Sequence, residues 1–190
     1  IILKILYLSK AIFPSEISHS LSIMRVCQAL YDMGNEVILT GVKSNNINDD
    51  PIKYYGVNGG FNISLVKSTG FLNNQLLRFL RLTNLIKSIK NWFIIKKEKP
   101  DIIYSRLTLV ELLFVPKNIP IIYEMHSLSY IGKKWHKKLI FLLILKRKNL
   151  DRIIVTTHSL AKMLQNYFPK TKIIVAQLSA ELPITISEKQ

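Results

Sequence analysis

LKILYLSKAIFPSEISHSLSIMRVCQALYDMGNEVILTG, residues 3–41, is the stretch that decides the fold of this chain. It opens with an apolar run, residues 5–8, of the length of a buried strand, and a polar loop follows at residues 14–20. Apolar side chains then recur at i, i+3, i+4 and i+7, which is typical of a helix with one buried face. These positions are Ile23, Val26, Cys27 and Leu30. Gly34 predicts the end of the helix, and the apolar run 37–39 predicts a second strand.

Strand, loop, helix, glycine and strand make a βαβ unit, which needs parallel strands and a right-handed crossover. Both strands lack polar alternation, so we expect helices on both faces of the sheet. Later apolar runs predict further strands at residues 62–66, 101–104, 120–123, 151–155 and 172–175. The predicted fold class is α/β: a doubly wound, mostly parallel Rossmann-like sheet of about seven strands with helices on both faces.

The later helices are predicted from the same spacing. They span residues 73–97, 107–114 and 133–148, and a last one follows Thr157, a predicted N-cap. The first of them should bury Leu82, Leu85, Ile86, Ile89 and Phe93. The last should bury Leu160, Met163, Leu164 and Tyr167.

Length and cysteine content limit the architecture and the compartment. A chain of 190 residues suits one domain, which we expect at residues 1–176, with 177–190 as a tail or the start of a crossover to a further domain. The single cysteine, Cys27, excludes an internal disulfide, favours a reducing, cytoplasmic compartment and is expected to pack in the core. We see no signal peptide at the N-terminus and no apolar run near the ~18 residues of a membrane span.

The net charge of +15 favours an anionic partner: a phosphorylated ligand, an anionic lipid or nucleic acid. The alternative is a lysine-rich chain without a specific partner. The very basic segment 133–148 predicts peripheral attachment to an anionic membrane surface, such as the inner face of the plasma membrane. It could equally be a core helix with solvated ends. A nucleic-acid-binding domain is favoured only by the charge, because no RNP-like strand or helix-turn-helix spacing is present.

The usual phosphate and metal motifs are absent. No G-x-G-x-x-G, Walker loop, CxxC or HExxH occurs in the chain, so no metal site is predicted. Instead, polar residues follow three predicted strands, whose carboxyl ends share one edge of a parallel sheet. These residues are Ser15, Ser18, His19 and Ser20 after the first strand, Ser105 and Arg106 after the fourth, and Glu124, His126 and Ser127 after the fifth.

His126 is the best candidate for chemistry, because histidine can accept or donate a proton near neutral pH. The loop before the first helix favours an anion, since free backbone N–H groups and the helix dipole meet there. Taken singly, Ser18 or Ser20 could be only an N-cap, Arg106 a surface ion pair, and His126 a loop histidine. The convergence of the three groups on one edge is what favours a site.

Several segments, in this order, resemble family 4 glycosyltransferases. Residues 4–9, 14–16, 18–20 and 29–37 resemble the start of that family, and residues 100–106, 121–126 and 150–157 resemble later segments. The likeness covers residues 2 to about 175. Two positions depart from it: Ser18-His19 stands where many relatives carry Gly-Gly, and residues 177–180 read QLSA where relatives usually read Pro-Asn-Gly or Pro-Asp-Ala.

The resemblance implies the GT-B architecture, in which an N-terminal Rossmann-like domain binds the acceptor and a C-terminal one binds the nucleotide-sugar donor. It implies retention of anomeric configuration without a metal or another cofactor, with a glycan or lipid-linked acceptor, as in polysaccharide biosynthesis. His126 would stand beside the reacting sugar. The donor phosphates would approach Ser15, Ser18, His19 and Ser20, and the acceptor side would include Ser105, Arg106, Glu124 and Ser127.

By resemblance, this chain corresponds to the acceptor-side half of such an enzyme, and we expect it to fold alone without turning over a sugar nucleotide. The alternative is a non-catalytic α/β binding module for an anionic, phosphorylated ligand. A partner nucleic acid is not expected.

Overall fold

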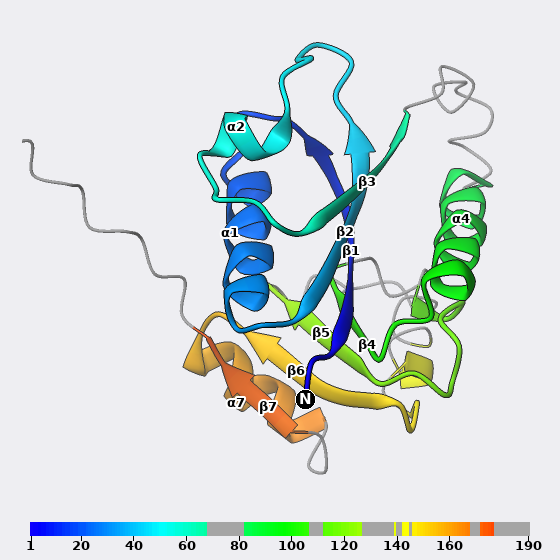
Figure 1. The fold of residues 1–190 in the computed structure, drawn as a ribbon. Helices are drawn as coiled ribbons and strands as arrows, with labels where there is room; N and C mark the ends of the chain where they lie inside the picture. The colour runs from blue at the N-terminus through cyan, green and yellow to red at the C-terminus, as the bar shows by residue number, and fades with distance from the viewer. Residues whose placement is uncertain are drawn as a thin grey trace, which may run out of the picture.

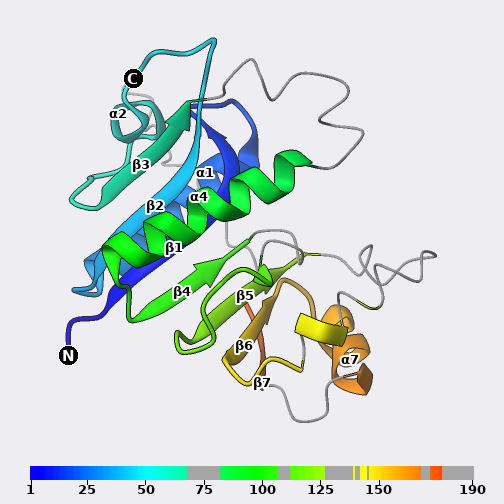
Figure 2. The ribbon, with the colours of Figure 1, turned by 90° about the vertical axis from the view of Figure 1, so that its right-hand side faces the viewer.

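The computed structural model describes residues 1–67, 82–106, 112–126, 139, 142–144, 146–167 and 172–176, with only the backbone at 82–88. Seven parallel strands form one sheet in the order β3-β2-β1-β4-β5-β6-β7 (Figures 1 and 2). The strands are β1 (Lys4–Phe13), β2 (Glu36–Lys43), β3 (Asn62–Lys67), β4 (Ile102–Ser105), β5 (Ile121–Met125), β6 (Leu150–Val155) and β7 (Lys172–Val175). The predicted parallel α/β fold class is confirmed.

Helices cover both faces of this sheet. They are α1 (Ser18–Asp32), α2 (Pro51–Tyr55), α4 (Leu82–Glu98) and α7 (His158–Tyr167). α1 and α4 lie on opposite sides of β1 and β2 in Figure 1. Alternate residues of β1 feed two cores: Ile5 and Tyr7 pack in the cluster that includes residues of α1, whereas Leu6 and Leu8 pack in the cluster that includes residues of α4 and α7.

The first strand is longer than its apolar run predicts. Its pairing with β2 shifts register between Leu8 and Ile12, and the strand continues to Phe13, which is fully buried. The ring of Phe13 occupies the space beside Gly41 of β2, where a side chain would otherwise project. This contact fixes the point at which the chain leaves the sheet for the loop before α1.

The short helix α2 was not predicted, because five residues are too few for a periodic apolar pattern. Its signals are local: Asp50 accepts a hydrogen bond from the N–H of Ile52, Pro51 occupies the first turn, and Gly56 ends the helix in the left-handed conformation. The N-cap predicted at Thr157 is confirmed, because its hydroxyl accepts the N–H of Leu160 at 3.2 Å.

The buried face predicted for α4 is wrong at two positions. Ile89 and Phe93 are 46% and 61% exposed, and Ile95 is buried instead. The helix carries apolar residues on two sides. The side that packs against the sheet contains Ile95 and the partly buried Ile94. In α7, likewise, Leu160 and Leu164 are buried as predicted but Met163 is 52% exposed.

Some expectations lie outside the described residues: Ser127, most of the helix predicted at 107–114, most of the basic segment 133–148, and the tail 177–190. Within that basic segment, Arg147 is described, and its guanidinium donates to the carbonyls of Leu112 and Val115. That cation therefore ties two parts of the chain together. Among the described residues, no helix has the length and apolar character needed to cross a membrane.

Replacing Gly41 by alanine is expected to destabilise the fold, because the new Cβ would lie 2.6 Å from ring carbons of buried Phe13. We expect the free energy of unfolding to fall by about 1–3 kcal/mol, as for overpacking elsewhere. Urea denaturation followed by circular dichroism measures the change. Phe13→Leu, which makes room, should recover part of the loss in the double variant. Equal stability of Gly41→Ala and the unchanged chain would contradict this packing.

Candidate active site

The candidate site lies where the strand order reverses. The chain runs outward from β1 through β2 to β3 on one side, and from β4 through β5 to β7 on the other. β1 and β4 are neighbours at this reversal, and the carboxyl ends of the strands at such a point are the usual ligand site of open parallel sheets. The first of the three groups of polar residues predicted from the sequence follows β1. The other two lie at the carboxyl ends of β4 and β5, where Ser105 and Glu124 are still within the strands.

Alternation along the strands sets which side chains meet there. On β5, Ile122 packs in the core that includes residues of α1, whereas Tyr123 and Met125 pack in the other core. Glu124 and His126 follow Ile122 at two-residue steps, so they continue its face. On β4, Arg106 continues the face of Tyr104 in the same way, and Tyr104 pairs with Tyr7 of β1 in register.

The carboxylate of Glu124 is the centre of the site. Its side chain is only 7% exposed. Oε2 accepts hydrogen bonds from the hydroxyls of Tyr7 at 3.3 Å and Tyr104 at 3.1 Å. Oε1 accepts a hydrogen bond from Nε2 of His126 at 2.7 Å and lies 3.5 Å from Nε of Arg106. A buried carboxylate needs this many partners to offset the loss of its hydration.

Tyr7 and Tyr104 donate their two hydrogen bonds to this carboxylate from adjacent strands. Their rings stack with centroids 4.8 Å apart and planes 15° from parallel, so both hydroxyls reach the same oxygen. Burial, together with the nearby charge of Glu124, raises the pKa of both phenols well above the ordinary value. The phenols therefore stay protonated and remain hydrogen-bond donors at physiological pH.

Arg106 is a buried cation that retains unused donors. Its side chain is 6% exposed, and neither Nε nor Nη1 makes a hydrogen bond with any group in the part of the chain that the structure describes. Its ion pair with Glu124 is long, at 3.5 Å. A guanidinium presents donors in a planar fork that suits a phosphate or a carboxylate. An anionic ligand beside Arg106 would supply the hydrogen bonds that the buried Nε and Nη1 lack among the described residues.

His126 is the exposed end of the cluster. Its side chain is 34% exposed, in contrast to the carboxylate that holds it. Because a carboxylate only accepts, Nε2 carries the hydrogen that Glu124 receives, and in the neutral ring Nδ1 is then an acceptor. This imidazole can accept a hydrogen bond, or a proton, from a ligand hydroxyl at Nδ1.

His19, in the first turn of α1, belongs to the same neighbourhood. Partial burial lowers the pKa of His19, and the positive charges of Arg106 and then His126 lower it further, whereas Glu124 acts in the opposite direction. First-turn N–H groups carry the positive end of the helix dipole, although the N–H of Ser20 already donates to the carbonyl of Ile17 at 2.9 Å. His19 therefore lies within electrostatic range of Arg106, His126 and Glu124.

The predicted serines differ in what they can reach. Ser18 is exposed at the start of α1, and the cap residue is Ile17, so Ser18 is not an N-cap. Ser15 accepts the N–H of Ile17 and is tied to the hydroxyl of Tyr55 through its backbone. Ser20 is buried and donates to the carbonyl of Ile12 at 3.0 Å. Ser105 is also buried and has an interaction partner. Ser20 and Ser105 are therefore packed inside the protein near the strand ends.

Sequence reasoning missed Tyr7 and Tyr104. Both sit inside apolar runs, where tyrosine reads as a core residue. Tyr104 could have been found from its position, because it lies one residue before the end of β4. Tyr7 lies in the middle of β1 and comes beside Tyr104 only through strand pairing. Cys27 is buried, and burial raises its pKa, which agrees with the expected core role. No cluster of three potential metal ligands occurs among the described residues.

Comparison with known proteins adds family information. The model of the family described as Glycosyltransferase Family 4 matches residues 20–177. A glycosyltransferase from Rickettsia africae ESF-5 superposes with a TM-score of 0.61 at 15% identity, over 95% of this chain and 44% of that one. No curated protein sequence matches the chain.

Two further solved structures share the fold. A putative UDP-N-acetylglucosamine 2-epimerase from Listeria monocytogenes gives a TM-score of 0.60 at 13% identity, over 96% of this chain and 50% of that one. UGT73P12 from Glycyrrhiza uralensis, complexed with glycyrrhetinic acid 3-O-monoglucuronide, gives a TM-score of 0.57 at 12% identity, over 92% of this chain and 48% of that one. The chain spans about half the length of each of these structures.

Removing either tyrosine hydroxyl is expected to weaken the fold through Glu124. Tyr7→Phe and Tyr104→Phe should each lower the free energy of unfolding by about 1–3 kcal/mol, because a buried acceptor loses a donor. The double variant should deviate from additivity, since both hydroxyls serve Oε2. Tyr31→Phe, at a partly exposed ring, is the matched control. A loss no larger than that of the control would show that the carboxylate does not depend on these donors.

His19 is expected to titrate below the ordinary histidine pKa of 6.5. Because the folded pKa is the lower one, the unfolded chain binds more protons, so the contribution of His19 to stability falls as pH drops through 6.5 towards the folded value. Arg106→Gln should raise the pKa of His19, whereas Arg106→Lys should leave it low. NMR titration measures it, with the resonance assigned by His19→Asn. An unchanged titration in Arg106→Gln would place Arg106 away from His19.

Proposed function

The chain belongs to Glycosyltransferase Family 4, and from this premise we propose that it forms the acceptor-binding half of a retaining GT-B enzyme. The whole enzyme would transfer a sugar from a nucleotide-sugar donor to a glycan or lipid-linked acceptor. The family match over residues 20–177 supports a glycosyltransferase domain, and the parallel sheet has the expected Rossmann-like form. The donor, the acceptor and the stereochemistry are parts of the proposal.

One observation carries the proposal: the 2.7 Å contact between Nε2 of His126 and the buried carboxylate of Glu124. It fixes the ring and leaves Nδ1 for a ligand. In the proposed complex His126 is the catalytic residue, beside the reacting sugar. There it would accept a hydrogen bond from a sugar hydroxyl, or a proton when that hydroxyl reacts. Glu124 is a positioning residue that also stabilises the imidazolium if a proton arrives.

The anionic groups of the substrates would meet the positive parts of the site. The start of α1 at Ser18 and His19 suits the donor phosphates, because backbone N–H groups and the helix dipole both favour an anion. The unused donors of Arg106 suit a second anionic or hydroxyl group on the acceptor side. Ser15 and Ser20 would shape the phosphate loop, and Ser105 and Ser127 the acceptor side.

Donor binding would fall mainly to a second Rossmann-like domain of the whole protein. Transfer needs the donor and acceptor held in near-attack geometry, which one wall of a cleft does not provide. We therefore propose that residues 1–190 alone bind sugar nucleotides weakly, at about millimolar concentration and in a salt-dependent way. We also propose that transfer requires no metal and takes place in the cytoplasm.

The alternative from another functional class is a non-catalytic module that binds an anionic ligand. Arg106 and the start of α1 would serve such a module equally well, because they need no proton transfer. His126 separates the two hypotheses. In a binding module its loss should weaken affinity modestly, whereas in an enzyme it should remove turnover while the substrate still binds.

His126→Ala is expected to lower kcat about 10²–10⁴-fold, the usual contribution of a positioned acid or base. The measurement is sugar transfer from labelled sugar nucleotides by a form of the protein that carries both Rossmann-like domains. His158→Ala, at the exposed start of α7, is the matched control and should leave kcat unchanged. If His126→Ala and His158→Ala have equal kcat, the assignment of His126 is wrong.

A further inference from the structure

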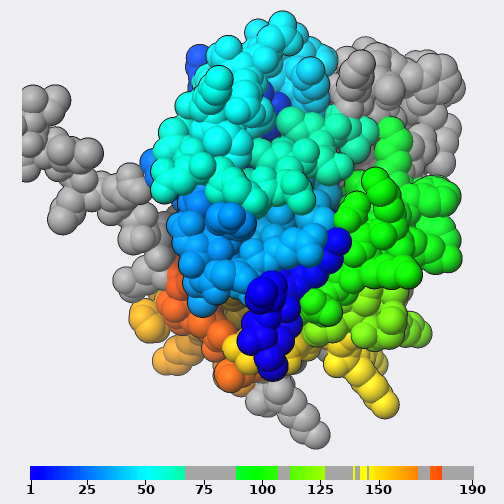
Figure 3. All heavy atoms as spheres, in the orientation of Figure 1, coloured from blue at the N-terminus to red at the C-terminus, as the bar shows by residue number. Residues whose placement is uncertain are grey.

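The outer face of α4 has an unusual composition for a helix on a sheet. Exposed Ile89 and Phe93 lie one turn apart and form an apolar stripe. Lysines stand on both sides of the stripe in the 3.6-residue repeat of the helix. We call this set the outer face of α4: Ile89, Lys90, Trp92, Phe93, Lys96 and Lys97. In Figure 3 the atoms of α4 form an outer edge of the visible surface.

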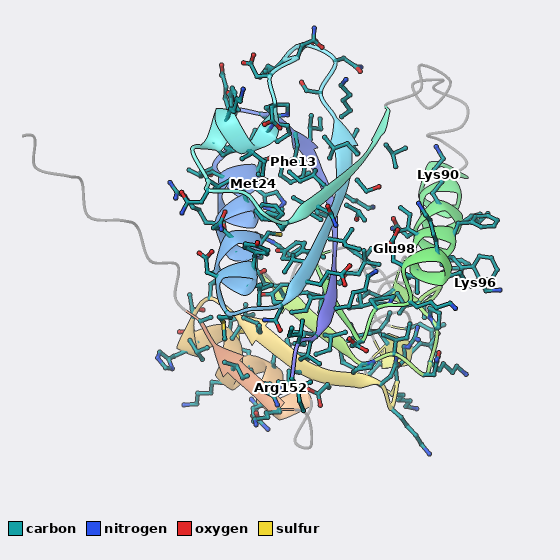
Figure 4. All side chains as sticks on the ribbon, in the orientation of Figure 1. Phe13, Met24, Lys90, Lys96, Glu98 and Arg152 are labelled. Carbon is teal, nitrogen blue, oxygen red and sulfur yellow. The ribbon has the colours of Figure 1, made fainter. Side chains whose placement is uncertain are left out.

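The opposite face of the helix holds its only acidic residue. Within residues 82–98 that residue is Glu98. Its carboxylate pairs with Lys4 of β1 at 3.3 Å, so it is turned towards the sheet. Figure 4 shows Glu98 on the sheet side of α4 and Lys96 on the far side. The other oxygen of Glu98 lies 3.8 Å from Nζ of Lys97. The outer face still carries an excess of positive charge, because its three lysines outnumber this single carboxylate.

The aromatic residues of this face are arranged as at a polar–apolar boundary. The ammonium of Lys96 lies 4.0 Å from the ring centroid of Trp92, and the rings of Trp92 and Phe93 meet edge to face at 5.2 Å. Tryptophan prefers the headgroup level of a membrane, because its ring is apolar and its N–H is polar. Lysine can keep its stem along apolar surface while its charge stays in water.

We propose that the outer face of α4 docks on an anionic lipid surface. Ile89 and Phe93 would enter the headgroup region, and Lys90, Lys96 and Lys97 would contact anionic headgroups. Charge complementarity selects this occupant over a second copy of the chain. Each copy carries a net charge of +15, so two such faces would repel one another.

This surface deepens the part of the proposed function that concerns a lipid-linked acceptor. It differs from the basic segment 133–148 that the sequence suggested, in which Arg147 is committed to backbone carbonyls. Vesicle binding needs no sugar transfer, so the docking surface and the proposed activity can fail separately. A chain that docks without transferring sugar would leave this inference intact.

The test is sedimentation with vesicles of phosphatidylcholine alone and of phosphatidylcholine mixed with phosphatidylglycerol. The chain should bind the anionic vesicles far better, and added salt should weaken that binding. Lys90→Gln with Lys97→Gln should reduce the affinity about 25-fold, since each lysine near an anionic surface contributes about fivefold. Phe93→Ser should also reduce it, with little change in its salt dependence. In a Trp135→Phe background, the fluorescence of Trp92 should shift to the blue on binding.

Matched controls lie on α7 and β7, away from α4 in Figure 1. Lys162→Gln with Lys172→Gln removes the same charge from exposed positions, and Met163→Ser removes a similarly exposed apolar side chain. Circular dichroism confirms that every variant is folded. Equal binding to both vesicle types, or full binding by the α4 variants, would overturn the proposal. So would a change in oligomeric state, with unchanged vesicle binding, in the α4 variants.

Discussion

The burial of the Glu124 carboxylate is the constraint on which the site depends. A carboxylate with a 7% exposed side chain is stable only if its oxygens are well supplied with donors. The donors come from Tyr7 on β1, Tyr104 on β4 and His126 after β5, and Arg106 adds a nearby cation. One charged group thus links three adjacent strands at the point where the strand order reverses, and the same contacts hold the imidazole and the guanidinium beside it.

This arrangement makes strand register a functional property. Tyr7 faces Tyr104 in the β1–β4 pair, and Ser105 faces Tyr123 in the β4–β5 pair. A slip of one residue would turn Glu124 into the opposite core and carry His126 with it. The fold itself does not choose the reaction, since both a glycosyltransferase and a putative epimerase superpose on it at low identity. The reaction is determined by the side chains at the strand ends.

The sequence predicted those parts that depend on local pattern. The βαβ unit followed from apolar spacing, and the polar strand ends indicated where Arg106 and His126 should lie. Tyr7 and Tyr104 were missed because apolarity alone does not tell a core phenol from one whose hydroxyl serves a carboxylate. The burial of Ile89 and Phe93 was predicted wrongly because α4 has two apolar stripes, and only tertiary packing decides which one the sheet covers.

The excess positive charge of this molecule lies away from the candidate site. At the site, the guanidinium of Arg106 faces the carboxylate of Glu124, so that pair is close to neutral. The large positive excess therefore resides elsewhere. On α4 the lysines outnumber the one carboxylate, Glu98, which contacts both Lys4 and Lys97. Exposed lysines act through a field that salt screens within about 10 Å, whereas the buried cluster is largely shielded. The proposed association with a lipid surface and the proposed acid–base role of His126 therefore depend on different groups.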